Sequence, residues 1–322
     1  MSAAEPVLEA RDLRRAFGAV QALGGLSLQV RPGEIYGLVG CDGAGKTTAI
    51  RILTGLMAPD AGTARVLGQD PLGSAAGDLR SAIGYMPQHY SLYGDLSVAE
   101  NLRFFSRMFC QSKQEYHERR ERLLRITRLA PFVDRRADAL SGGMYKKLAL
   151  ACSLLPRPRI LLLDEPTNGV DPVSRRELWA LLFELVNEGM AILISTAYMD
   201  EAARCHRVGL IHHGRLLLEG SPSELLAGFP QLVLEVEGPG IERAEALLAT
   251  HPAVVTSSAA GPRLRAVVDA NRAAELRQAL EQTGARVRQA QPSFEDLFLT
   301  RIVAGPDATS AVRAEQETEA GA

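Results

Sequence analysis

The sequence has few cysteines and lacks any long apolar run. Four cysteines are scattered through 322 residues without a CxxC spacing, which argues against both a zinc site and a disulfide framework. No stretch of about 18 consecutive apolar residues occurs, so no segment is expected to span a membrane. The first ten residues, MSAAEPVLEA, carry an acid and a proline where a signal peptide needs bases and an apolar core. We therefore expect a soluble, cytosolic protein.

An excess of positive charge is also lacking. Lysine and arginine total 36 against 38 aspartates and glutamates, so no basic field marks a nucleic-acid-binding protein. The apolar fraction of 46% is enough for a sizeable core and argues against wholesale disorder. At 322 residues, the chain is expected to form two domains and a tail.

Short apolar runs separated by helical patterns predict an α/β fold in the first two thirds of the chain. Each run is too short for a core helix and is bounded by glycine, proline or charge; the runs are Ile35–Val39, Ile160–Leu163, Ala191–Ser195 and Val208–His212. Long helical stretches between such strands imply parallel pairing. Residues 97–155 break this rhythm and predict a helical subdomain, with Ser97 and Glu100 forming a capping box at its start.

The pattern changes again near residue 230. Strand-like alternation at Leu232–Val236 and Leu264–Val268, each followed by a helical pattern, predicts a small α+β domain over residues 230–303. Residues 304–322 lack apolar periodicity and are expected to form a disordered tail. The α/β domain is then expected to cover residues 5–228.

A glycine-rich segment follows the first buried strand and precedes a helical run. Its sequence, GCDGAGKTT, matches G-x-x-x-x-G-K-[ST] in the strand-to-helix context that this pattern requires. Glycines let consecutive main-chain amides surround phosphate oxygens, while the helix directs its positive end toward them. Lys46 would neutralise the β- and γ-phosphates, and the Thr47 hydroxyl would bind Mg²⁺. The expected nucleotide-binding residues are Gly40, Cys41, Asp42, Gly43, Ala44, Gly45, Lys46, Thr47 and Thr48.

A second apolar strand, Ile160–Leu163, ends in two acids. Because α/β folds bind ligands at the carboxyl edge of the sheet, Asp164 is placed to hold Mg²⁺. Glu165 would take a proton from the attacking water. Gln88 follows a further predicted strand, Ile83–Met86, and its amide would reach the metal and the attacking water.

The segment LSGGM stands at the start of another predicted helix. Ser141 can cap that helix, and the two glycines after it let the backbone approach an anion closely. A plain helix N-cap is the alternative interpretation. The candidate residues are Leu140, Ser141, Gly142, Gly143 and Met144.

Taken in this order, the segments resemble the motifs of the ATP-binding cassette (ABC) ATPases. GCDGAGKTT is similar to the Walker A loop, Gln88 to the Q-loop, LSGGM to the signature, ILLLDE to the Walker B strand, and NGVD, which ends in Asp171, to the D-loop. The resemblance covers about residues 5–225 and implies a P-loop NTPase fold with a helical subdomain. Phe17 stands where the family stacks an aromatic ring on adenine, with an ordinary core phenylalanine as the alternative.

Three further segments are similar to the ATP-binding subunits of bacterial drug and polymer exporters: DEPTNGVDPVSRRELW, STAYMDEAARC and PSFEDLFL. The resemblance implies a transport-coupled ATPase that uses ATP and Mg²⁺ and is peripheral on the inner face of the cell membrane. It implies pairing as a homodimer, or as a heterodimer with another ABC subunit, around two ATP molecules. The implied partners are integral membrane permease subunits, with no nucleic acid, and the implied role of the C-terminal domain is accessory or regulatory.

Position 197 departs from the family pattern. The family's switch histidine would follow Ser195–Thr196, where this chain has Ala197. A methyl group cannot hydrogen-bond a γ-phosphate, and losing one such contact slows chemistry by on the order of 10²–10³. The chain's own site is therefore expected to be slow or degenerate, while nucleotide binding survives. Tyr198 and His206 are the candidate substitutes.

Two other function classes remain open. One is a non-hydrolysing regulatory ABC partner, which the substitution at position 197 would suit. The other is a soluble ABC ATPase acting on the ribosome or DNA, although such proteins usually carry a second cassette or a coiled-coil or zinc insertion. Residues His89–Asp95 follow the Q-loop glutamine and are expected to contact the permease, with a partly buried loop as the alternative.

Overall fold

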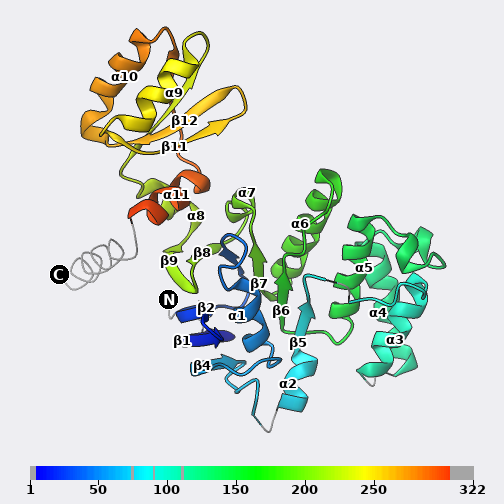
Figure 1. The fold of residues 1–322 in the computed structure, drawn as a ribbon. Helices are drawn as coiled ribbons and strands as arrows, with labels where there is room; N and C mark the ends of the chain where they lie inside the picture. The colour runs from blue at the N-terminus through cyan, green and yellow to red at the C-terminus, as the bar shows by residue number, and fades with distance from the viewer. Residues whose placement is uncertain (1–4, 74–75, 90, 110–111, 305–322) are drawn as a thin grey trace. The chain divides into compact units, whose positions relative to one another are not determined.

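The computed structural model describes residues 5–73, 76–89, 91–109 and 112–304. The chain divides into two compact units, Met1–Leu216 and Leu217–Ala322 (Figure 1). This division falls earlier in the chain than the boundary expected between residues 228 and 230. Each unit has a sheet and a core of its own.

The first unit contains the five parallel strands of a six-stranded sheet, and the boundary between the units falls within the sixth strand. The order is β5 (Ile83–Met86), β6 (Ile160–Asp164), β7 (Ala191–Thr196), β3 (Ile35–Val39), β8 (Arg207–His212) and β9 (Arg215–Gly220). Because β5, β6, β7 and β3 run in the same direction, their carboxyl ends meet at one edge. The glycine-rich loop, Gln88, the Asp164–Glu165 pair and Ala197 all follow from that edge.

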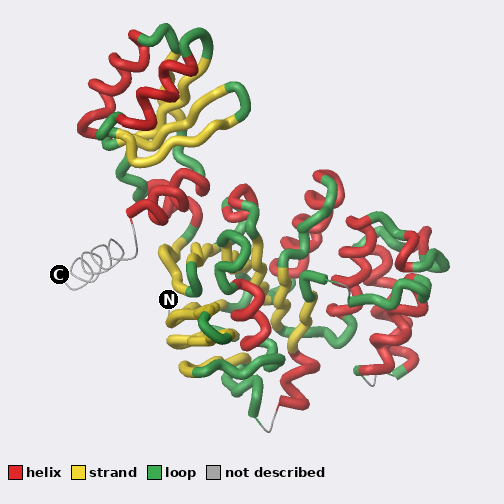
Figure 2. The backbone as a smooth tube through the Cα atoms, in the orientation of Figure 1, coloured by secondary structure: helices red, strands yellow, loops and turns green. Residues whose placement is uncertain are grey.

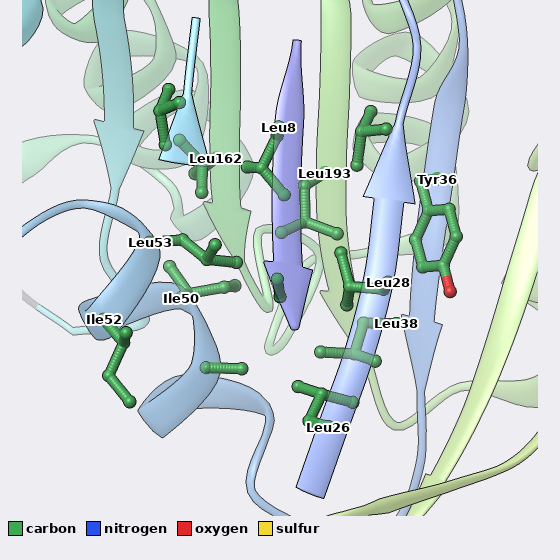
Figure 3. Close-up of a cluster of buried hydrophobic side chains, with 14 of the residues drawn as sticks. Leu8, Leu26, Leu28, Tyr36, Leu38, Ile50, Ile52, Leu53, Leu162 and Leu193 are labelled. Atoms are coloured by element: carbon green, nitrogen blue, oxygen red, sulfur yellow. The ribbon is translucent and has the colours of Figure 1, made fainter. Parts of the chain in front are cut away.

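A second, antiparallel sheet of order β2-β1-β4 completes the core of this unit. Its strands are β1 (Leu8–Phe17), β2 (Val20–Val30) and β4 (Ala61–Val66). Helix α1 (Lys46–Leu53) packs its buried side chains into one cluster with strands of both sheets, as Figure 3 shows. Side chains labelled in that cluster are Leu8, Leu26, Leu28, Tyr36, Leu38, Ile50, Ile52, Leu53, Leu162 and Leu193.

The segment between β5 and β6 is helical, as predicted. It contains α3 (Val98–Met108), α4 (Lys113–Ile126) and α5 (Gly142–Leu154), with two short 3-10 turns, η1 (Ala130–Phe132) and η2 (Ala137–Ala139). Figure 2 shows these helices gathered beside the strands of the unit. The predicted capping box is confirmed, because the Ser97 hydroxyl accepts from the Glu100 amide and the Glu100 carboxylate accepts from the Ser97 amide. The remaining helices of the unit are α2 (Ala76–Ala82), α6 (Pro172–Asn187) and α7 (Met199–Ala202).

The second unit contains a four-stranded antiparallel sheet of order β11-β12-β10-β13. The strands are β10 (Leu232–Glu237), β11 (Val254–Ala260), β12 (Arg263–Val268) and β13 (Arg286–Ala290). Its helices are α8 (Pro222–Ala227), α9 (Ile241–Thr250), α10 (Ala273–Gln282) and α11 (Phe294–Ala304), with a 3-10 turn, η3 (Ala270–Arg272). The α+β character of this unit agrees with the prediction from the sequence. Strands β11 and β13 were not predicted, because apolar and polar side chains do not alternate along them.

Charged and apolar side chains alternate along the central strand β10 of this sheet. Leu234 and Val236 belong to the core shared with α9 and α10, whereas Glu235 lies opposite Arg265 and Arg288 in the neighbouring strands. Because side chains of a strand alternate between its two faces, these charged residues lie on the face away from that core.

Parts of the predicted organisation lie outside the described residues. These are Tyr90 and Cys110 and, apart from Ala304 at the end of α11, the predicted tail. Among the helices that are described, none combines the length and apolarity needed to cross a membrane.

Candidate functional site

Residues 40–45 form the turn between β3 and α1, and two of its glycines are required by packing. A Cβ atom at Gly40 would lie 2.3 Å from the carbonyl oxygen of Ile211. Gly45 precedes α1 with φ of 106°, and a Cβ there would lie 2.4 Å from the Ala22 carbonyl. Only glycine tolerates both the left-handed backbone and the close approach, so the turn holds the N-terminus of α1 in a fixed place.

Lys46 folds back over the loop that precedes it. Its side chain is 3% exposed, and Nζ donates to the carbonyls of Gly40 at 2.8 Å and Cys41 at 3.0 Å. Nζ also lies 3.1 Å from Oε1 of Glu165. Asp42, by contrast, is 91% exposed and its Oδ1 is 3.8 Å from Nζ, so solvent screens most of its charge.

Asp164 and Thr47 come together at the end of β6. The buried Asp164 carboxylate accepts through Oδ1 from the Ser195 hydroxyl at 2.7 Å and from the Thr47 hydroxyl at 3.2 Å. Its Oδ2 is buried without a hydrogen-bond partner among the described residues. A buried, unpartnered carboxylate oxygen is costly, and a carboxylate beside a hydroxyl is the oxygen donor set that Mg²⁺ prefers. The residues therefore fit the metal role that the sequence assigns to Thr47 and Asp164.

Glu165 is held in an unusual backbone conformation. Its φ is 48°, which is uncommon for any residue with a Cβ, and its amide donates to the Ser195 hydroxyl at 3.0 Å. Its Oε2 accepts from Gln88 Nε2 at 2.7 Å and from Asn168 Nδ2 at 3.3 Å. The Gln88 amide thus points at the predicted general base, and the contact that the structure records for it is to Glu165 rather than to the predicted metal ligand Asp164.

Two residues that the sequence did not single out support this cluster. Ser195 bridges the Asp164 carboxylate and the Glu165 amide. Lys146 of α5 donates from Nζ to the Gln88 carbonyl at 2.9 Å; burial lowers its pKa, and the nearby charges of Asp164 and Glu165 oppose that shift. Two features of the sequence could have identified these residues. Ser195 is a polar residue at the end of an apolar strand, and Lys146 is one of very few lysines in the chain.

The predicted signature segment caps α5. Ser141 is the N-cap, and its hydroxyl accepts from the Met144 amide at 3.4 Å. Ser141 and Gly142 are exposed, whereas Gly143 is buried so closely that an added Cβ would lie 2.3 Å from Ser174 Cβ in α6. The first residues of this helix are therefore exposed to solvent. Ser141 caps the helix, and the exposed N-terminus also leaves room for the anion contact, so the structure agrees with both interpretations of LSGGM.

Asp171 caps a helix, and Phe17 is exposed at the end of a strand. Asp171 is the N-cap of α6, and hydrogen bonds to its carboxylate from Ser174 and then Val173 lower its pKa. Phe17 ends β1 and is 45% exposed, with the Arg15 guanidinium carbon 5.1 Å from the ring centroid. It is not a core residue, so its ring is accessible for stacking.

Ala197 follows the end of β7, and the two proposed substitutes for a histidine there are engaged elsewhere. The ring of Tyr198 lies 4.4 Å from the Arg175 guanidinium carbon. His206 accepts through Nδ1 from the Ile35 amide, at the amino end of β3. That end is opposite to the edge carrying the loop, so the interpretation of His206 as a substitute was wrong.

The chain is similar to ATP-binding proteins of transporters. Residues 23–168 match the family model described as ABC transporter. The Nod factor export ATP-binding protein I of Paraburkholderia xenovorans is 41% identical over 73% of this chain and 78% of its own length. The protein of that name from Rhizobium sp. is 36% identical over 91% of this chain and 95% of its own. The probable multidrug ABC transporter ATP-binding protein YbhF of Escherichia coli is 46% identical over 69% of this chain, but the match spans only 38% of its length.

Solved structures lead to the same fold. One described as the ATP binding subunit of an ABC transporter matches 69% of this chain and 93% of its own, with a TM-score of 0.62 and 31% identity. The structure of cbiO1 from Clostridium perfringens, described as part of the ABC transporter complex cbiONQ, matches 77% and 96% with a TM-score of 0.64 and 27% identity. The predicted P-loop NTPase fold of the ABC type is confirmed.

Proposed function

Because the chain belongs to the ATP-binding subunits of ABC transporters, we propose that it binds ATP with Mg²⁺ at residues 40–48 and drives a membrane permease that exports a compound. The observation that carries the proposal is the cluster at the carboxyl edge of the parallel sheet. There Lys46 lies against its own loop and Glu165, and the neighbouring Thr47 bonds to Asp164, whose other carboxylate oxygen has no partner among the described residues.

Hydrolysis follows from the contacts of Lys46 and Glu165. The phosphates of ATP are the natural partners of a buried ammonium held over a glycine-rich loop, so Lys46 turns from Glu165 to them on binding. This frees Oε1 of Glu165 to accept a proton from water, which the Gln88 amide orients. Thr47 and Asp164 would hold Mg²⁺, which supplies neutralisation of phosphate charge when bound.

A second cassette completes each site. The exposed N-terminus of α5, with Ser141 and Gly142, has no nucleotide of its own to contact and would serve the γ-phosphate held by another chain. The partner is a second copy or an unlike ABC subunit. Because Ala197 affects only the site built on this chain's own Walker motifs, an unlike partner would retain a faster site completed by this chain's signature.

The proposed permease contact lies after Gln88. Tyr93 is 47% exposed, its ring packs edge-on against Phe104 with centroids 4.5 Å apart, and its backbone bonds to the buried Asn101 of α3. An aromatic ring fixed on a rigid backbone is a typical anchor for a partner. Relatives named for Nod factor export and multidrug transport support an exporter, and the proposed location of the subunit is the inner face of the membrane.

A second candidate function is a regulatory partner that binds ATP without hydrolysing it. The observation favouring it is Ala197, together with the engagement of Tyr198 and His206 elsewhere. Turnover, rather than binding, separates the two functions.

Calorimetry on the full chain tests the common premise. We expect MgATP to bind, and Lys46→Ala to weaken binding by about tenfold or more, because a charged hydrogen-bond donor is lost. Lys113→Ala is the matched control, since it removes an exposed lysine at the start of α4, outside residues 40–48, and it is expected to change affinity little. Absence of any MgATP uptake by the unmodified chain would rule out both candidate functions.

A further inference from the structure

We propose that Glu201 is a positioning residue whose single buried carboxylate fixes two loops of the ATP site. One loop carries the general base Glu165, and the other carries residue 197. The inference rests on the proposed function and extends it to a residue that touches neither nucleotide nor metal.

Glu201 is fully buried in α7 and is met by donors from three segments. Its Oε2 accepts from the Thr196 hydroxyl at 2.7 Å and the Thr167 hydroxyl at 3.0 Å, and its Oε1 accepts from the Trp179 indole at 3.2 Å. All three partners are themselves at most 1% exposed. A buried carboxylate satisfied this completely is expensive to disturb, because any lost donor leaves a desolvated charge unpaired.

The first loop follows β6. Thr167 lies two residues after Glu165, and the turn is closed by bonds from the Asn168 amide to the Glu165 carbonyl and from the Val170 amide to the Thr167 carbonyl. This turn holds Glu165 at φ of 48°. Left-handed conformations of residues with a Cβ persist only where the surroundings enforce them, and the Thr167–Glu201 bond is one such constraint.

The second loop follows β7. The Thr196 hydroxyl, which donates to Glu201, also accepts from the Tyr198 amide at 3.0 Å. Residue 197 therefore lies between Thr196 and Tyr198, and the Thr196 hydroxyl holds both of these neighbours in place. Arg175 lies beside both Glu201, at 3.8 Å from Oε1, and the ring of Tyr198, so α6 supports the same arrangement.

Glutamine is the informative replacement because it keeps the shape and removes half of the acceptors. The indole of Trp179 can only donate, so an oxygen must stay opposite it and the new NH₂ must face the two threonines. Each hydroxyl then has to accept from the amide, and neither can donate its proton to residue 201. The charge-assisted bonds of the common anchor are replaced by neutral bonds of reversed direction, and each hydroxyl proton loses its buried acceptor, while the core side chains keep their volume.

The experiment uses the full chain with Glu201→Gln, and Glu188→Gln as the matched control. Glu188 is also an ion-paired carboxylate of this unit, bonded to Arg122 beyond the far end of α6. Amide hydrogen exchange is followed in residues 165–171 and 196–198, MgATP affinity by calorimetry, and hydrolysis under single-turnover conditions.

We expect Glu201→Gln to raise exchange in both loops together and to slow hydrolysis by about tenfold, as loss of an outer-layer partner typically does. MgATP affinity is expected to stay within about threefold, since Lys46 and residues 40–45 are not bonded to Glu201. Unchanged exchange in either loop, or unchanged hydrolysis, would overturn the proposal. So would an equal rise in exchange throughout β6, β7 and α6, which indicates a merely structural role.

Two further variants keep the question answerable if the glutamine variant does not fold. Thr167→Val and Thr196→Val each remove one donor without changing charge, and each is expected to loosen its own loop and slow hydrolysis with little effect on affinity. If the unmodified chain binds MgATP but never hydrolyses it, alone or with its partners, hydrolysis by this chain is refuted. Exchange in the two loops then still decides whether Glu201 anchors them.

Discussion

Ala197 is the residue at which we propose that the site is chemically incomplete. It lies at the correct edge of the sheet, next to Thr196 and the Glu165 loop, but it has no group that can donate to a γ-phosphate.

Ala197→His is therefore expected to raise ATP turnover by on the order of 10²–10³, because one preorganised donor to developing charge is restored. MgATP affinity should change little, as the phosphate contacts of Lys46 and the loop are untouched. Steady-state hydrolysis with calorimetry checks this, and Ala203→His, at an exposed position, provides the control. A histidine at 197 that leaves turnover unchanged contradicts the interpretation of this position as the missing switch.

Cys41 is the second residue whose environment yields a prediction. Its side chain is exposed in the loop whose carbonyl binds Lys46, whereas Cys152 and Cys205 are buried, and burial raises the pKa of both of those thiols. Maleimide is expected to modify Cys41 and to prevent MgATP binding through steric bulk, and bound MgATP is expected to protect the thiol. Mass spectrometry and calorimetry measure both effects, with Cys41→Ser treated identically as the control. Complete modification without loss of affinity would refute the prediction.

Among the elements, α11 buries Phe294, Leu297 and Phe298 and is bonded to its sheet through one arginine. Arg265 of β12 donates from Nε and Nη2 to Asp296 of α11, from Nη1 to Glu235 of β10, and from Nη2 to the Gln291 carbonyl. Burial by itself would raise the pKa of the Asp296 carboxyl, but hydrogen bonds from Arg265 and Ser293 outweigh it and the pKa is lowered. The ionised form of Asp296 therefore favours the folded unit.

A lowered folded-state pKa determines the direction of the pH effect. The contribution of Asp296 is complete above its unfolded pKa, near 3.9, and is lost as pH falls from there through the lower folded pKa. Asp296→Asn is expected to destabilise the second unit by about 1–3 kcal/mol at pH 7, since Arg265 loses a buried partner. The difference from the unmodified chain should shrink below about pH 4.

Urea unfolding of the full chain, monitored by hydrogen exchange in β10, β12 and α11, measures this difference. Glu281→Gln is the control, because its ion pair with Arg277 is half exposed on α10 and is worth a few tenths of a kcal/mol, roughly. Equal effects of the two substitutions would show that the Asp296 contact does not hold α11.

At the scale of the whole molecule, the number of proposed nucleotide-binding elements in one chain matters most. Each chain carries one loop at residues 40–48 and one signature at residues 140–144, and the signature packs against the N-terminus of α6. Under the proposed function, a complete site requires two chains.

Mixing two inactive variants tests this arrangement. Ser141→Arg is expected to abolish turnover while keeping MgATP affinity, because its own loop is intact. Lys46→Ala is expected to lose affinity while keeping a working signature. An equal mixture should regain part of the turnover of the unmodified chain, since each mixed pair contains one complete site. A mixture as inactive as its parts would exclude the homodimer and require an unlike cassette.

The motifs were readable from the sequence because their geometry is local. A glycine-rich turn between a strand and a helix specifies its own backbone, and β3 and β5 have the predicted bounds, Ile35–Val39 and Ile83–Met86. Strands β4, β11 and β13 were not predictable in this way. In AGTARV only Val66 is buried, so pairing with a neighbour, rather than an apolar face, makes this segment a strand.

The residues that support the site could be identified only from the tertiary structure. Ser195 meets Asp164 across 31 residues, Glu201 meets Thr167 across 34, and Lys146 meets Gln88 across 58. These contacts exist because β6 and β7 are neighbours in the sheet and α5 packs beside β5. Strand order and helix packing depend on how the whole core is buried. A local sequence pattern therefore does not reveal which polar side chains will come into contact.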